Sequence, residues 1–224
     1  MTPMQRRPEP ELMDDPAQAL AYAEADFSEP HDRFVQLFQT RFGEFRPRHV
    51  LDLGCGPGDI CRRFARAYPD CEVHGIDGAQ AMLDVGSRLL QGAPEAARIQ
   101  LLLGRLPNAA PPLPSYDTII SNSLLHHLDD PRVLWQAVAR HATAGAAVFI
   151  MDLMRPDSEA IAARLVETYA SDEPEVLQRD FFHSLCAAYR PEEVRAQLAG
   201  AGLGQLQVEI ISDRHWIASG ISWA

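Results

Sequence analysis

The stretch Val50-Leu-Asp-Leu-Gly-Cys-Gly-Pro-Gly-Asp59 decides the fold that we expect for this chain. It begins inside a short apolar run, His49 to Leu53, of the kind that forms a strand buried on both faces of a sheet. Its second half places three glycines directly before a helical pattern. Glycines let a ligand approach the backbone, and the start of a helix offers free N–H donors. The segment therefore predicts a buried parallel strand that ends in a ligand-binding loop.

The middle of the chain repeats this alternation of strand and helix. We expect strands at 49–53, 72–76, 99–103, 117–121 and 147–153, and helices at 60–68, 79–90 and 131–142. Such alternation predicts an α/β fold with a mostly parallel sheet and helices on both faces. Two final strands, 205–212 and 215–220, are separated only by Asp213-Arg214, which predicts an antiparallel C-terminal hairpin. The expected fold is a Rossmann-like sheet of seven strands.

The remaining segments differ in composition. Residues 1–15 are rich in Pro, Glu and Asp, which is typical of a flexible tail. Residues 16–45 show helical spacing, with Pro16 at a first helical position. The rest, 46–224, is expected to be one domain with an insertion at about 156–190. That insertion should hold a helix at 158–171, followed by an irregular polar and aromatic segment up to Tyr189, and a helix should then span 191–200.

Charge and cysteine usage narrow the classes of partner. The formal net charge of −11 repels a phosphate backbone, so we expect no nucleic-acid partner. The four cysteines form no CxxC pair and no zinc-ligand spacing, so no metal site is expected. No apolar run approaches ~20 residues and the N-terminus has no signal-peptide pattern, which predicts a cytoplasmic protein without a membrane span.

Two acidic residues accompany the glycine loop. Asp52 lies inside the strand end, where an unpaired carboxylate is costly, so it needs a donor from the backbone or from a ligand ammonium group. Asp77 ends the second strand roughly 20 residues after the loop, as a ribose-binding carboxylate does. The alternative for Asp77 is a helix N-cap for Ala79 onward. The G-x-G-x-G spacing, with Asp59 at the next position, differs from the G-x-G-x-x-G of dinucleotide enzymes.

The run LDLGCGPG resembles motif I of class I S-adenosylmethionine (SAM)-dependent methyltransferases, and the similarity extends over about Val50 to Leu153. The resemblance is to the small-molecule and quinone-type members. It implies that SAM is the cofactor and S-adenosylhomocysteine (SAH) the product. The cofactor-binding residues that it implies are Asp52, Gly54, Cys55, Gly56, Asp77, Gly78, Met82, Arg105, Leu106 and Ser121.

Arg105 departs from the family pattern. Many members carry an acidic residue after the third strand that accepts a hydrogen bond from the adenine amino group, and an arginine has no acceptor atom. Its guanidinium either stacks on the adenine or points to solvent.

The sequence carries fewer signals for the residues that would bind the methyl acceptor. His126 and His127 follow the fourth strand and are the candidate catalytic residues, as a general base or as groups that orient the loop. Residues 16–45 resemble the helical lid of small-molecule methyltransferases, with amphipathic packing as the alternative. Asp152 and Arg155 either contact the acceptor or form an ion pair within the loop. The aromatic residues of the insertion either line the acceptor pocket or belong to the core. The candidate substrate-pocket residues are Tyr22, Phe27, His31, Asp152, Arg155, Tyr169, Phe181 and His183.

Together these features predict an enzyme that transfers a methyl group from SAM to a small organic acceptor. The N-P-P-[YF] signature of amino-directed base methylation is absent, since Ser-Asn-Ser-Leu stands at that place. Two alternatives stay open: a SAM-binding enzyme with a non-methylating reaction, and a catalytically silent SAM-fold partner protein.

Overall fold

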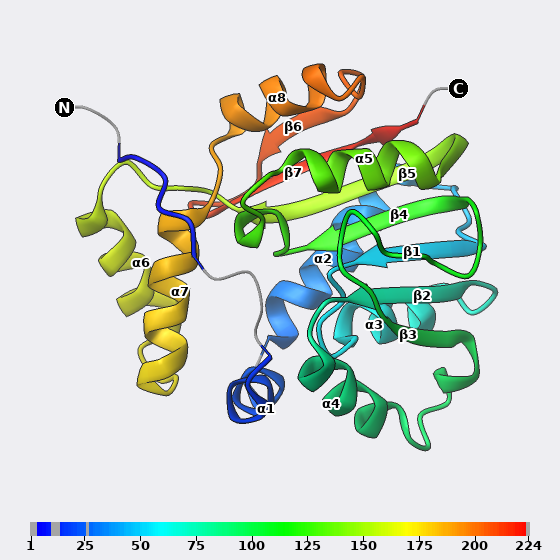
Figure 1. Cartoon of the computed structure of the whole chain (residues 1–224), viewed down its shortest axis with the longest axis horizontal. Helices are drawn as coiled ribbons and strands as arrows, with labels where there is room; N and C mark the ends of the chain where they lie inside the picture. The colour runs from blue at the N-terminus through cyan, green and yellow to red at the C-terminus, as the bar shows by residue number, and fades with distance from the viewer. Residues whose placement is uncertain (1–3, 10–13, 26, 223–224) are drawn as a thin grey trace.

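A computed structural model describes residues 4–9, 14–25 and 27–222. A seven-stranded sheet in the order β3-β2-β1-β4-β5-β7-β6 runs through the molecule (Figure 1). Strands β1 to β5 pair in parallel, while β7 is antiparallel to both β5 and β6. The strands are His49–Leu53, Glu72–Asp77, Ile99–Leu103, Tyr116–Asn122, Ala142–Leu153, Gln207–Ile210 and His215–Ile221. The predicted α/β fold with an antiparallel C-terminal pair is confirmed.

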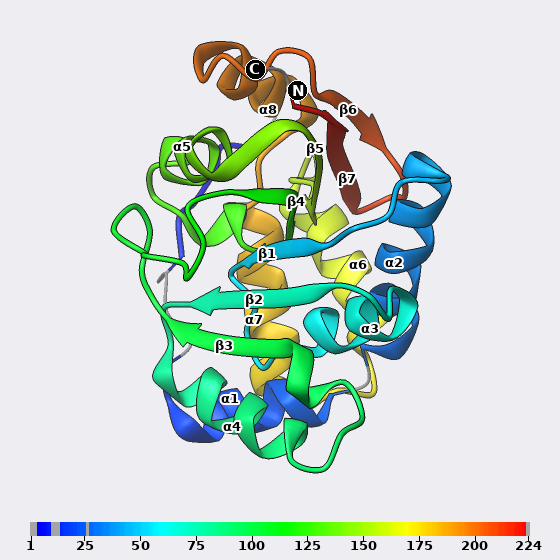
Figure 2. The ribbon, with the colours of Figure 1, turned by 90° about the vertical axis from the view of Figure 1, so that its right-hand side faces the viewer.

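Helices cover both faces of the sheet because the strand side chains alternate between two cores. Leu51 and Leu53 of β1 face the core that contains Trp135, which is formed with α5 (Arg132–His141) and α8 (Pro191–Gly200). Val50 faces the opposite core, which contains Phe34 and Phe64 from α2 (Ser28–Phe42) and α3 (Asp59–Ala67). Figure 2 shows α2 and α3 on one side of the sheet and α5 on the other. Both faces of β1 are therefore buried against other side chains, as its continuous apolar sequence predicted.

The remaining helices lie at the sheet ends and edge. Helix α1 (Pro16–Glu24) contacts α4 (Gln80–Leu90), and α6 (Glu159–Ala170) pairs with α7 (Glu175–Ala187). Two short 3-10 turns, Ala96–Arg98 and Leu125–His127, precede β3 and follow β4. No helix within 4–9, 14–25 and 27–222 is both long and apolar enough to cross a membrane.

Helix α7 corrects the sequence analysis, which predicted an irregular segment up to Tyr189. Pro174 stands before the first turn and Glu175 within it, a favourable helix start. The polar residues Gln178, Arg179 and Asp180 and then His183 and Ser184 interrupt its apolar positions, so the sequence shows no clear helical stripe. Packing against α6 holds this segment in a helix, because tertiary contacts override weak local patterning.

The described part of the segment that we expected to be a flexible tail makes specific contacts. The N-terminal strap, residues 4–9, lies beside α6 and α7 in Figure 1. The Met4 N–H donates to the Asp157 carbonyl at 3.2 Å, and the Arg7 N–H donates to the Cys186 carbonyl at 3.0 Å. The strap therefore approaches the carboxyl end of the sheet, where the predicted site lies.

Candidate functional site

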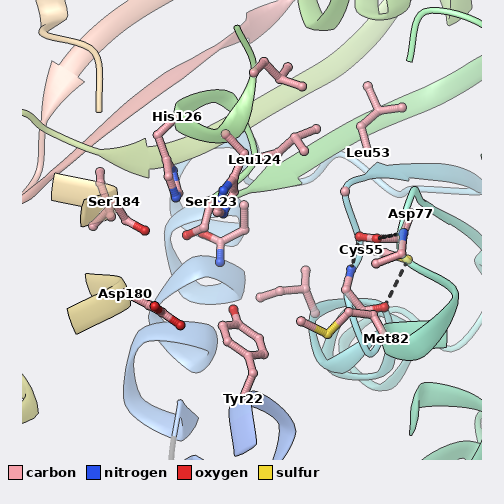
Figure 3. Close-up of a pocket in the computed structure, with 18 of the residues that line it drawn as sticks. Tyr22, Leu53, Cys55, Asp77, Met82, Ser123, Leu124, His126, Asp180 and Ser184 are labelled. Atoms are coloured by element: carbon pink, nitrogen blue, oxygen red, sulfur yellow. Dashed lines mark hydrogen bonds between the residues drawn. The ribbon is translucent and has the colours of Figure 1, made fainter. Parts of the chain in front are cut away.

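A cavity of about 1070 Å³ opens at the carboxyl ends of the parallel strands. Its walls come from the loops after β1, β2, β3 and β4, from α1 and α2, from α6 and α7, and from the strap. In Figure 3, Asp77 and Met82 lie at one end and His126, Asp180 and Ser184 at the other. Ligands of open α/β sheets bind in this crevice, and the volume exceeds that of most single-ligand pockets.

The glycine loop is fixed by backbone hydrogen bonds to the next strand. The N–H groups of Gly54 and Cys55 donate to the Ile76 carbonyl at 2.8 and 3.0 Å. A Cβ on Gly54 would lie 2.7 Å from the Leu124 side chain, so this position tolerates no side chain. Gly56 has a φ of +52°, and nothing lies within 4 Å of its missing Cβ. The loop therefore presents bare backbone to the cavity.

Asp77 joins the two βα turns. One carboxylate oxygen accepts the Gly56 N–H at 2.8 Å, and the other accepts the Ala79 N–H at 2.8 Å. Burial raises the pKa of Asp77, although these hydrogen bonds oppose the shift. The Gly78 backbone also hydrogen-bonds this carboxylate, whose two oxygens have about four acceptor sites in all, so one remains. Asp77 therefore holds the loop and still offers an acceptor site to a ligand.

Asp52 is buried with little support from the protein. It is 1% exposed, and among the described residues its side-chain partner is the Cys61 thiol, which donates at 3.1 Å. Burial raises the pKa of Asp52 to about 7. A cationic group in the cavity would compensate this carboxylate, since a buried charge needs a partner.

Asn122, at the end of β4, carries a buried side-chain oxygen that has no hydrogen-bond partner among the described residues. It lines the same cavity. Buried polar atoms are almost always paired, so this oxygen indicates a donor that a ligand would supply. Sequence reasoning did not single out Asn122.

The other cofactor candidates divide into two groups. Gly78, Met82, Arg105 and Leu106 line the cavity. Ser121 does not, because its hydroxyl points into the sheet and donates to the Leu53 carbonyl at 2.6 Å.

His126 lies at the opposite end of the cavity and is 2% exposed. Its Nδ1 is 2.5 Å from an oxygen of Asp152, whose other oxygen accepts the Leu125 N–H at 2.6 Å. Burial lowers the pKa of His126, but the Asp152 carboxylate outweighs it and the pKa rises overall. Asp152 thus sets the ring orientation and leaves Nε2 for other partners. It lies behind the cavity wall and contacts His126 there.

The aromatic residues of the helical segment lie together on the cavity wall. The ring centroids of Tyr22 and Phe27 are 4.7 Å apart, and those of Phe27 and His31 are 5.4 Å apart. His31 is anchored by Asp59, 2.8 Å from its Nδ1. Of the insertion candidates, Tyr169, Phe181 and His183 also line the cavity.

Arg155 lies elsewhere, among the elements beside the cavity. Its guanidinium donates to the carbonyls of Met4 and Ala188 and to the Glu193 carboxylate. It therefore supports the strap and is not among the residues that line the cavity.

Several further lining residues had no role in the predicted site, among them Glu9, Gln18 and Ser184. Gln18 donates to Asp180 at 2.7 Å, and Ser184 donates to Glu9 at 2.9 Å. Only the packing of the strap and α1 against α7 brings them together, so no local pattern identifies them.

The sequence of this chain is similar to those of known methyltransferases. Residues 51–148 match the family model described as a methyltransferase domain. Malonyl-[acyl-carrier protein] O-methyltransferase of Halalkalibacterium halodurans is 30% identical over 101 residues, 44% of this chain and 37% of that protein. Trans-aconitate 2-methyltransferase of Mycobacterium ulcerans is 31% identical over 132 residues, 58% of this chain and 45% of the relative. The chain thus spans less than half the length of either relative.

A solved structure shares the fold over nearly the whole chain. The plantazolicin methyltransferase BpumL in complex with SAH aligns with a TM-score of 0.68 at 14% identity, covering 92% of this chain and 91% of that one.

Proposed function

From the premise that this chain carries the class I SAM-dependent methyltransferase domain and fold, we propose that it transfers a methyl group from SAM to a small organic acceptor and releases SAH. The observation that carries the proposal is the set of unsatisfied or exposed polar groups at one end of the cavity. Asp52, Gly56 and Asp77 line this end, and they would meet an ammonium, a carboxylate-bearing chain and a ribose of the cofactor. The residues present therefore fit the cofactor.

The roles of the cofactor-side residues follow from their chemistry. Asp52, with the unpartnered Asn122 oxygen nearby on the same wall, would receive the ammonium group. Asp77 would accept from a ribose hydroxyl, and Met82 would pack against the adenine. SAM supplies the electrophilic methyl group, so the protein mainly aligns the acceptor and excludes water. Alignment alone contributes on the order of 7–11 kcal/mol.

The acceptor would occupy the end of the cavity between the 3-10 turn after β4 and the paired helices α6 and α7. His126 and His127 line this end of the cavity and would act on the attacking atom of the acceptor, where a hydroxyl or thiol must lose a proton. Tyr22, Phe27, His31, Tyr169, Phe181 and His183 would form the rest of the pocket. The net charge of −11 supports a small molecule rather than nucleic acid as the acceptor. The four free cysteines support a cytoplasmic location.

Calorimetric titration with SAH tests the cofactor half of this proposal. We expect Asp77→Ala to weaken SAH binding by at least tenfold, about 1.4 kcal/mol. Asp84→Ala removes an exposed carboxylate of α4, whose partner is Gln80, and should leave binding within twofold. Absence of SAH binding to the unmodified chain would overturn the proposed function.

A further inference from the structure

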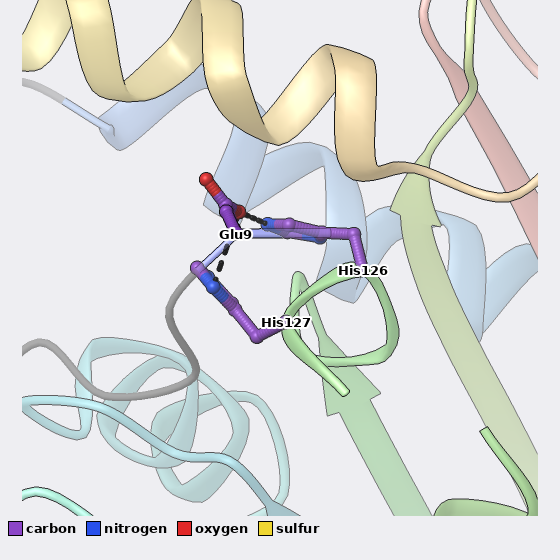
Figure 4. Close-up of side chains that lie close together, drawn as sticks. All are labelled: Glu9, His126 and His127. Carbon is purple, nitrogen blue, oxygen red and sulfur yellow. Dashed lines mark ion pairs between the residues drawn. The ribbon is translucent and has the colours of Figure 1, made fainter. Parts of the chain in front are cut away.

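A side chain of the strap and two from the 3-10 turn after β4 converge on the acceptor end of the cavity (Figure 4). One oxygen of Glu9, from the strap, lies 3.6 Å from His126 Nε2 and 3.2 Å from His127 Nδ1. One potential ligand atom from each residue lies within 4.8 Å of the others. All three residues line the cavity, so the space between them opens toward the acceptor region.

His126 is held as a metal-ligating histidine is held. Its Nδ1 contacts the Asp152 carboxylate at 2.5 Å, and Asp152 is itself fixed by the N–H groups of Leu125 and Leu153. Histidine ligands of metals almost always give their second ring nitrogen to such a carboxylate, which fixes the ring and raises its basicity. The Nε2 of His126 is therefore oriented toward Glu9 by a buried second partner.

Glu9 is also held in place. The Ser184 hydroxyl donates to the same Glu9 oxygen at 2.9 Å. Three residues earlier, the Arg6 guanidinium donates to the carbonyls of His126 and Leu128, each at 3.0 Å, and to the Ala187 carbonyl. Arg6 also lies 4.2 Å over the Tyr189 ring. The strap and the histidine turn are thus joined, so Glu9 and the two histidines keep one geometry.

The negative charges at this cluster favour the binding of a cation. Glu9 has only 10% of its side chain exposed. The Asp152 carboxylate contacts Nδ1 of His126, and Asp180 adds a further negative charge near Glu9. A buried carboxylate that its neighbours do not fully compensate is stabilised by a bound cation.

We propose that Glu9, His126 and His127 bind a divalent first-row transition metal ion such as Zn²⁺. Two imidazoles and one carboxylate form a common three-residue set for this ion, with a remaining position for water or substrate. At Zn–ligand distances of 2.0–2.1 Å, tetrahedral ligand atoms lie about 3.3 Å apart, close to the 3.2 and 3.6 Å observed here. The sequence predicted no metal, because a glutamate 117 positions before the His-His pair (126 − 9) has no recognisable spacing.

In the proposed methyl transfer, the open coordination position would hold the attacking oxygen of the acceptor and make its proton easier to remove. This role rests on the proposed function, whereas metal binding itself does not.

Metal titration of the full chain, without a histidine tag and after chelator treatment, tests the site. We expect one Zn²⁺ per chain with a micromolar or lower Kd by calorimetry. Co²⁺ in its place should give the strong visible absorption of a four- or five-coordinate ion. Glu9→Gln and His127→Gln should each weaken binding at least tenfold. Glu173→Gln removes another carboxylate that lines the cavity, and His141→Gln removes a surface histidine; both should leave binding unchanged. Thermal melts of each variant check that it folds.

Two outcomes overturn the proposal: a Kd above roughly 100 μM, or tighter binding that Glu9→Gln and His127→Gln leave intact. The buried Cys55 and Cys61 are the other candidate ligands, so metal binding abolished only by Cys61→Ser also overturns it. SAH titration of the same samples keeps the two proposals separate. SAH binding without metal binding removes the metal site alone, and metal binding without SAH binding removes the methyltransferase function alone.

Discussion

At the end of the cavity where we propose the cofactor, the contacts join residues that are close in the chain or lie on adjacent strands, such as Gly56 with Asp77. At the end where we propose the acceptor, the strap meets segments more than a hundred residues away, as Arg6 does at His126 and Ala187. The first region is built by the sheet itself. The second is built by packing peripheral elements over the sheet, so it depends on long-range contacts and is expected to open more easily.

The largest effect should come from detaching the strap. Arg6→Ala removes three hydrogen bonds from a charged donor, which we expect to weaken docking of the strap by about 3 kcal/mol. Hydrogen exchange at the Met4 and Arg7 amides should then be roughly 100-fold faster, while SAH binding changes less than twofold.

The matched control for Arg6 is its neighbour. Arg7→Ala breaks an ion pair with Glu159 whose partners are 54% and 61% exposed, so exchange should change little. If Arg6→Ala also abolished SAH binding in a folded protein, the two ends of the cavity would not be independent.

A smaller effect, on the free energy of unfolding, should come from adding a side-chain atom between α4 and the glycine loop. A Cβ on Gly86 of α4 would lie 2.6 Å from the Pro57 carbonyl oxygen, so Gly86→Ala must push the loop backbone away. We expect a loss of about 2 kcal/mol in the free energy of unfolding, measured with urea.

Gly200→Ala is the contrasting helix substitution, because nothing lies within 4 Å of its missing Cβ at the end of α8. Removing backbone freedom from the unfolded chain should there stabilise the protein by less than about 1 kcal/mol. Equal effects of the two substitutions would contradict the tight packing of the loop against α4.

The smallest effect concerns pH. The pKa of Asp52 is about 7 in the protein without ligand, and an ammonium beside it would favour the ionised form. SAH binding should therefore strengthen as pH rises toward 7 and weaken as pH falls, by about tenfold between pH 7 and 5.5. The ligand ammonium stays protonated over this range.

Asp52→Asn should remove this pH dependence, whereas Asp84→Asn should retain it. Calorimetry at several pH values measures both. A pH-independent affinity of the unmodified chain would show that Asp52 does not titrate against the ligand.

The difference between local and long-range contacts also explains which secondary-structure predictions succeeded. The strands 49–53 and 99–103 and the helix 191–200 have the predicted bounds, because apolar runs with glycine and proline boundaries are locally decisive. Strand β5 begins at Ala142 rather than 147, and β6 spans only Gln207–Ile210, because strand ends depend on pairing with neighbouring strands. Helix α7 was missed because its stability comes from α6.

The sequence by itself determined the sheet, the glycine loop and the acidic residues Asp52 and Asp77, since these follow from local periodicity and from spacing along consecutive strands. Only the tertiary structure decided that Glu9 reaches His126 and His127, that Asp152 lies behind His126, and that Ser121 turns into the sheet. The physical reason is that backbone propensity and strand alternation act over a few residues. Side-chain packing of a strap against two helices joins positions that no periodicity relates.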